Sequence, residues 1–121
     1  APLTDQTRYM INASALSVMK PGAILINVAR GGLVEEQAVV EALESGHLDS
    51  AGFDVTPEEP PAQDSLLWTA PRLIVTPHVG GQSKKRIDRM TDLFCENIIR
   101  YRRGRPLINI VDKKLGFPAP A

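Results

Sequence analysis

Residues 23–32, which read Ala-Ile-Leu-Ile-Asn-Val-Ala-Arg-Gly-Gly, decide the fold class of this chain. Positions 23–28 are almost wholly apolar and rich in β-branched side chains, and glycine or proline stands on both sides of the stretch. A short apolar run between such breakers predicts a strand that is buried on both faces, as in a parallel sheet. Arg30 follows this strand at its carboxyl end.

The rest of the chain predicts helices and strands that alternate around that run. Apolar residues recur at three- and four-residue steps in three segments, which predict helices over residues 12–19, 35–43 and 83–103. Asn12 and Ser83 stand where N-caps are expected. Apolar runs predict further strands over residues 50–55 and 72–76. This order predicts an α/β fold in which helices cover a parallel sheet.

The composition argues against several classes of protein. An apolar fraction of 43% and a charged fraction of 23% are ordinary for a globular domain, and no apolar run approaches the roughly 20 residues of a membrane span. The 14 basic and 14 acidic residues balance, so no overall field recruits nucleic acid or a membrane surface. Cys95 is the one cysteine, which excludes an internal disulfide and a cysteine-rich metal site and favours the cytoplasm.

The first residues predict that the sequence is part of a longer chain. The opening Ala-Pro-Leu-Thr-Asp-Gln-Thr-Arg has no initiator methionine, and it has neither the basic start nor the apolar centre of a signal peptide. It reads as the middle of a loop. We therefore expect a fragment or a processed product.

Polar residues stand at the end of each predicted strand. Arg30 follows the first strand, Asp54 ends the second with Glu58 and Glu59 close behind, and His78 follows the third. Ligands of parallel α/β sheets bind outside the carboxyl ends of the strands. We therefore expect Arg30, Asp54, Glu59 and His78 to meet on one rim. On spacing alone, each could instead be a solvated surface side chain.

These residue types suit proton transfer beside a bound acid. An imidazole changes charge close to neutral pH, which makes His78 a candidate acid and base. A carboxylate can hold the second ring nitrogen and stabilise the imidazolium, and either Glu58 or Glu59 could supply it. Arginine offers a planar, permanently charged fork for a carboxylate, so Arg30 is a candidate for binding an acidic ligand.

Three motifs of the sequence resemble those of one known family. They are Asn-Val-Ala-Arg-Gly-Gly-Leu-Val at 27–34, Gly-Phe-Asp-Val at 52–55 with Glu-Glu-Pro at 58–60, and Thr-Pro-His-Val-Gly-Gly at 76–81. Their order and spacing resemble the nucleotide-binding domain of the D-isomer-specific 2-hydroxyacid dehydrogenases. The glyoxylate/hydroxypyruvate reductase and phosphoglycerate dehydrogenase branches are the most similar. The resemblance extends from Pro2 through the long predicted helix.

The resemblance implies an enzyme that interconverts a small 2-oxo acid and a D-2-hydroxy acid by hydride transfer with NAD or NADP. It implies that Arg30 binds the substrate carboxylate, that His78 is the acid and base, and that Glu59, directly before a proline, is the partner of His78. Asp54 would hold the nicotinamide carboxamide. The implied cofactor-binding residues are Val28, Ala29, Arg30, Asp54, His78, Val79, Gly80 and Gly81, with Ala1 at a further lining position. The resemblance also implies a homodimer in the intact enzyme.

One part of the family pattern is missing from this sequence. No Gly-x-Gly-x-x-Gly turn for the pyrophosphate occurs in the chain. We therefore expect residues 1–103 to be the C-terminal half of a Rossmann-type NAD(P)-binding domain, and residues 104–121 to be an extended tail that returns to a substrate domain. Alone, such a fragment should bind dinucleotide weakly and turn over negligibly. Gly81 stands where some relatives have serine, so only its backbone could contact the cofactor.

Other functions remain open on the sequence. The same fold could serve as a cofactor-sensing or assembly module without turnover. The basic tract at 100–105, with Lys84, Lys85 and Arg86, could bind nucleic acid. The zero net charge of the chain favours a solvated helix end that complements the helix dipole instead. Outside the candidate site, His47 is expected to cap the helix that ends just before it.

Overall fold

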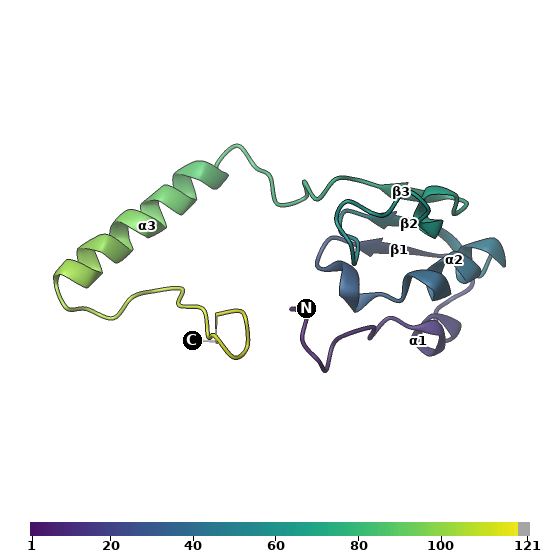
Figure 1. Ribbon diagram of the computed structural model, residues 1–121, viewed down its shortest axis with the longest axis horizontal. Helices are drawn as coiled ribbons and strands as arrows, with labels where there is room; N and C mark the ends of the chain where they lie inside the picture. Colours follow the sequence, from purple (N-terminus) through teal and green to yellow (C-terminus); the bar gives the residue numbers. More distant parts are fainter. Residues whose placement is uncertain (119–121) are drawn as a thin grey trace. The chain divides into compact units, whose positions relative to one another are not determined.

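The computed structural model describes residues 1–118, which form two compact units (Figure 1). Unit 1 comprises Ala1–Gly80 and contains every described strand. Unit 2 begins at Gly81 and contains the long helix α3, Arg86–Arg102. The boundary predicted after residue 103, between a nucleotide-binding part and a tail, stays a prediction.

Unit 1 is built on a three-stranded parallel sheet. Its strands are β1, Ala23–Asn27, β2, Leu48–Phe53, and β3, Leu73–Val75, in the spatial order β1-β2-β3. In register, Ile26 of β1 pairs with Gly52 of β2, which pairs with Ile74 of β3. The predicted parallel α/β sheet is confirmed. The carboxyl ends of all three strands therefore lie at the same end of the sheet, and the candidate residues follow them there.

Two α-helices of unit 1 pack on one face of this sheet (Figure 1). They are α1, Ala13–Ser17, and α2, Glu36–Glu44, and two short 3-10 helices, η1, Gly31–Leu33, and η2, Leu66–Trp68, lie in the loops. The N-cap predicted at Asn12 is confirmed, because its side chain accepts a hydrogen bond from the Ala15 N–H at 3.0 Å. The core between helices and sheet includes the buried side chains of Leu16, Val39, Leu43, Leu48, Phe53 and Leu67.

Within unit 1 the other face of the sheet is bare, which corrects the prediction that the strands are buried on both faces. Ile24, Ile26 and Ile74 are 64%, 68% and 70% exposed. Both helices of unit 1 share one core with the opposite face, to which Ala51 and Phe53 contribute. An apolar run shows that a strand face can be covered, but it does not show which segment covers it.

His47 follows α2 but does not cap it, so that prediction is wrong. Its Nε2 atom lies 2.8 Å from the carbonyl oxygen of Leu16 in the neighbouring helix α1. The carbonyl of Leu43, near the end of α2, instead accepts a hydrogen bond from the Arg72 guanidinium. Because α1 packs against α2, the histidine reaches a helix that lies far from it in the sequence.

Helix α3 of unit 2 begins at Arg86 and not at residue 83. Its N-cap is Lys85, which makes no side-chain capping hydrogen bond. The backbone carbonyl of Ser83 accepts a hydrogen bond from the Arg86 N–H at 3.1 Å, so the cap predicted for the Ser83 side chain is wrong. The helix ends at Arg102, and Gly104, with a φ of 61°, follows it, as the sequence predicts.

Residues 107–111, which the sequence left as a strand or an extended arm, form no strand. The Asn97 side chain of α3 holds this segment, because it donates to the Ile108 carbonyl at 3.0 Å and accepts from the Ile108 N–H at 2.9 Å. Part of the end predicted to be loose, 116–121, lies outside the described residues. Within residues 1–118, no helix is both long and apolar enough to cross a membrane.

Candidate active site

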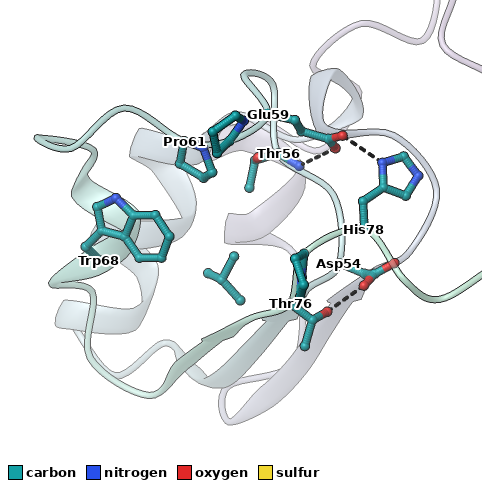
Figure 2. A pocket seen from close by; sticks show the side chains of 10 residues that line it. Asp54, Thr56, Glu59, Pro61, Trp68, Thr76 and His78 are labelled. Carbon is teal, nitrogen blue, oxygen red and sulfur yellow. Dashed lines mark hydrogen bonds and ion pairs between the residues drawn. The ribbon is translucent and has the colours of Figure 1, made fainter.

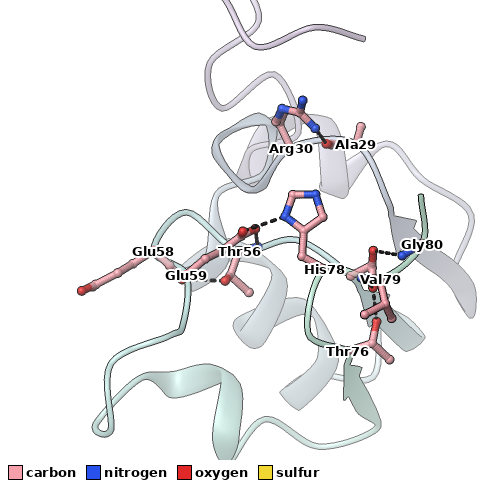
Figure 3. A network of polar contacts seen from close by, with 10 residues as sticks. Ala29, Arg30, Thr56, Glu58, Glu59, Thr76, His78, Val79 and Gly80 are labelled. Carbon is pink, nitrogen blue, oxygen red and sulfur yellow. Dashed lines mark hydrogen bonds and ion pairs between the residues drawn. The ribbon is translucent and has the colours of Figure 1, made fainter. Parts of the chain in front are cut away.

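The turn that carries Arg30 is shaped by Asn27, the last residue of β1. The Asn27 side chain is buried, donates to the Arg30 carbonyl at 3.0 Å and accepts from the Ala29 N–H at 3.1 Å. These two hydrogen bonds fold the chain back directly after the strand. The Arg30 guanidinium stays at the surface, where it donates to the Ala29 carbonyl at 2.7 Å (Figure 3).

The glycine after Arg30 is required by the close approach of two loops. A Cβ added to Gly31 would lie 2.0 Å from the carbonyl carbon of Thr56 and 2.2 Å from the nitrogen of Pro57. Only a residue without a side chain lets the Arg30 turn pack against the loop that follows β2. That loop carries Glu59, so the contact sets the distance between the arginine and the glutamate.

His78 and Glu59 face one another across the site. Nδ1 of His78 lies 2.7 Å from Oε2 of Glu59 (Figure 3). The other carboxylate oxygen accepts a hydrogen bond from the Thr56 N–H at 3.2 Å, and the Thr56 hydroxyl donates to the Glu58 carbonyl at 2.6 Å. A carboxylate at Nδ1 places the proton of a neutral imidazole on that nitrogen, which leaves Nε2 to act on a ligand.

The surroundings of Glu59 keep its carboxylate ionised. The hydrogen bond from His78 lowers the pKa of Glu59 most, and the Thr56 N–H adds to the effect. The charges of His78 and Arg30 lower this pKa further, while partial burial works in the opposite direction. Glu59 is therefore a stable acceptor that can hold the ring and stabilise its cationic form.

Asp54, directly after β2, binds the turn on which His78 lies. Its Oδ1 accepts hydrogen bonds from the Thr76 hydroxyl at 2.6 Å and the Val79 N–H at 2.9 Å, and its Oδ2 accepts one from the Gly80 N–H at 2.6 Å. These three donors, the Thr76 hydroxyl first, lower the pKa of Asp54, and the charge of His78 lowers it further against the effect of burial. A carboxylate has about four lone-pair sites, so one on Oδ2 is left for another donor.

Two hollows adjoin the His78–Glu59 pair. One, of about 380 Å³, has Arg30, Glu59 and His78 in its wall, together with Leu3, Gly31, Gly32, Thr56 and Pro57. The second, also of about 380 Å³, shares Thr56, Glu59 and His78 with the first and is otherwise lined by Asp54, Pro60, Pro61, Trp68, Val75, Thr76 and Pro77 (Figure 2). The structure thus brings Arg30, Glu59 and His78 to one hollow and places Asp54 in the wall of the adjoining one.

The other residues expected to bind the cofactor lie at strand ends or in loops. Val28, next to the Arg30 turn, is 66% exposed, and Val79, next to His78, is 38% exposed. A Cβ added to Gly81 would meet no atom within 4 Å, whereas one on Gly80 would lie 2.8 Å from Oδ2 of Asp54. Among residues 1–118, no group of three or more histidine, cysteine, aspartate or glutamate side chains is arranged to hold a metal ion.

Several residues at this site were not among those predicted from the sequence to bind or react. Among them are Leu3, Asn27, Thr56, Trp68 and Thr76. Asn27 and Thr76 stand inside the three motifs, but neither has a titratable side chain, so residue type alone does not mark them as site residues. Leu3 and Trp68 lie outside the three motifs, and only the tertiary structure brings them to the two hollows.

Comparison with known proteins gives consistent matches. The family model described as D-isomer specific 2-hydroxyacid dehydrogenase, NAD binding domain, matches residues 1–80. A glycerate dehydrogenase of Methylorubrum extorquens is 46% identical over 113 residues, which are 92% of this chain and 36% of that protein. A glyoxylate reductase of Pyrococcus furiosus is 39% identical over 114 residues, 94% of this chain and 34% of that protein. The chain therefore spans about a third of the length of these relatives.

Solved structures agree with these matches. One match is a D-isomer specific 2-hydroxyacid dehydrogenase from Xanthobacter autotrophicus Py2, in complex with NADPH and MES, with a TM-score of 0.85 and 40% sequence identity. The match covers 97% of this chain and 48% of the chain in that structure. An NADPH-dependent glyoxylate/hydroxypyruvate reductase from Sinorhizobium meliloti, in complex with NADP and sulfate, has a TM-score of 0.85 and 35% identity. It covers 97% of this chain and 38% of its own.

Proposed function

The chain belongs to the D-isomer specific 2-hydroxyacid dehydrogenase family, and from this we propose that it carries the catalytic edge of an NAD(P)-dependent oxidoreductase. The intact enzyme would interconvert a small 2-oxo acid, such as glyoxylate or hydroxypyruvate, and the corresponding D-2-hydroxy acid. The observation that carries the proposal is the 2.7 Å contact between His78 and Glu59, in a hollow that Arg30 also lines. We further propose a cytoplasmic homodimer.

In this proposal Arg30 binds the substrate carboxylate. Its guanidinium is a fixed cation that can donate two parallel hydrogen bonds to a carboxylate. In the described structure its Nη1 bonds only to the Ala29 carbonyl, a neutral partner that a carboxylate can outcompete. Because Arg30, Glu59 and His78 line the same hollow, an acid held by Arg30 lies next to the imidazole.

His78 would move the proton of the reaction. Reduction of a 2-oxo acid converts the C2 carbonyl oxygen to a hydroxyl, and the Nε2–H of a protonated His78 can donate the proton to that oxygen. In the reverse direction neutral Nε2 accepts the proton of the hydroxyl. Glu59 keeps Nδ1 bonded throughout and stabilises the imidazolium form, which is the form that donates.

The residues present suit a nicotinamide ring, which supplies or accepts the hydride when the cofactor is bound. Val28 offers an exposed apolar surface at the end of β1, and the remaining lone-pair site on Oδ2 of Asp54 can accept a carboxamide N–H. The pyrophosphate turn of the family does not occur in this sequence. We therefore expect the 121 residues alone to bind the dinucleotide weakly and to turn over negligibly.

The test uses the intact enzyme that contains this chain, with glyoxylate or hydroxypyruvate and both NADH and NADPH. His78→Ala should abolish turnover, because the proton donor is lost. The dissociation constant of the cofactor should change far less, because the proposed contacts of Val28 and Asp54 remain. His47→Ala, at a histidine outside both hollows, is the matched control. Near-normal turnover by the His78→Ala enzyme would refute the catalytic assignment.

One observation favours a second function, the binding of a polyanion. Ten of the 14 basic residues follow residue 80, together with only four of the 14 acidic residues. A salt-dependent shift of DNA mobility by the chain would support that function, and quenching of NADH fluorescence without such a shift would support the dehydrogenase. A cofactor-sensing module of the same fold would bind NADH but leave 2-oxo acids unreduced.

A further inference from the structure

His78 has a backbone conformation that needs support. Its φ is 54°, in the left-handed region that a side chain disfavours. Its N–H donates to the Thr76 carbonyl at 3.0 Å, so the chain reverses within three residues. Such a conformation persists only where the surrounding structure holds it.

The group that holds this turn is the carboxylate of Asp54, which is 7% exposed. It accepts hydrogen bonds from both sides of His78: the Thr76 hydroxyl before it, and the Val79 and Gly80 N–H groups after it. Two successive N–H groups around one anion form a stable nest. The Thr76 hydroxyl closes the other side, so the carboxylate joins the entry and the exit of the turn.

We infer that Thr76 is a positioning residue, whose hydroxyl, bonded to Asp54, holds the turn that directs Nδ1 of His78 at Glu59. This inference rests on the proposed function. Thr76 is in the wall of the second hollow and not of the one that Arg30 lines, so it touches neither the substrate nor the reacting atoms as proposed. Asp54 is a less suitable test residue, because it is also the proposed partner of the carboxamide.

The test compares three variants in the intact enzyme. Thr76→Val removes the hydroxyl and keeps the shape of the side chain. It should lower kcat by about 10- to 100-fold with a small change in the KM for glyoxylate, because a misplaced imidazole slows the proton transfer more than it weakens substrate binding. Thr76→Ser restores the donor and should restore most of kcat. Thr69→Val is the matched control, because the Thr69 hydroxyl is exposed and bonds only the Leu66 carbonyl at 3.3 Å.

A second readout reports the position of the ring without turnover. In NMR spectra, the Nδ1–H of His78 should give a strongly downfield proton in the parent, Thr76→Ser and Thr69→Val enzymes, and this signal should move or vanish in Thr76→Val. An unchanged signal and an unchanged kcat in Thr76→Val would overturn the positioning role. A changed signal in Thr76→Val, combined with full activity of His78→Ala, would overturn the proposed function and leave the positioning role standing.

Discussion

Replacement of Gly31 by alanine tests how closely the Arg30 turn and the Glu59 loop fit together. The new Cβ would stand 2.0 Å from the carbonyl carbon of Thr56, whereas ordinary contact begins at 3.4 Å. The loops must therefore separate by about 1.4 Å, because backbone atoms cannot rotate away as a side chain can. Overpacking of this kind costs about 1–3 kcal/mol of unfolding free energy. In the intact enzyme the displacement should also lower kcat/KM by about 100-fold.

Urea denaturation of the chain measures the first effect, and NAD(P)H oxidation with glyoxylate by the intact enzyme measures the second. Gly52→Ala is the matched control, since a Cβ on Gly52, in the middle of β2, would meet no atom within 4 Å. We expect it to leave the urea midpoint of the chain unchanged. If Gly31→Ala matched Gly52→Ala in urea and kept the parent kcat/KM in the intact enzyme, the close approach to Thr56 would not be the reason for glycine at this position.

Three further outcomes follow from the described contacts. Hydrogen bonds hold the pKa values of Asp54 and Glu59 below their ordinary range, so both carboxylates stabilise the fold above about pH 5 and lose this effect as the pH falls. The urea midpoint should therefore drop more steeply on acidification for the parent chain than for an Asp54→Asn, Glu59→Gln double variant. Leu43→Ala removes a fully buried side chain and should lower the unfolding free energy in urea by about 2–5 kcal/mol, and a loss well below this range would contradict its place in the core. Arg30→Lys should raise the KM for glyoxylate more than it lowers kcat, because lysine lacks the planar guanidinium that can bind both carboxylate oxygens. An unchanged KM in steady-state kinetics would count against the role of Arg30 in binding the substrate carboxylate.

The sheet was predictable because its strands are marked locally. Residues 23–28 lie between glycine and proline breakers, and β1 forms at Ala23–Asn27 within that run. What covers the strands was not predictable, since burial depends on elements distant in the sequence. For the same reason the contact of His47 with α1 could not be read from its place after α2.

The candidate site was predictable to the extent that residues follow strand ends. Arg30, Glu59 and His78 each follow a different parallel strand, so topology alone brings them to one edge. The hydrogen bonds that orient them were not predictable. Thr56 and Thr76 are common residues without a titratable side chain, and their partners become evident only when the loops are seen together.

The bare face of the sheet has a consequence for the behaviour of the chain in solution. In unit 1, β1 pairs with β2 alone, so its other edge presents unpaired N–H and C=O groups beside the exposed Ile24 and Ile26. An open strand edge next to exposed isoleucine is a template for strand addition by other molecules. We therefore expect self-association to limit the concentration at which the isolated chain can be kept, and charged substitutions at Ile24 or Ile26 should raise that limit.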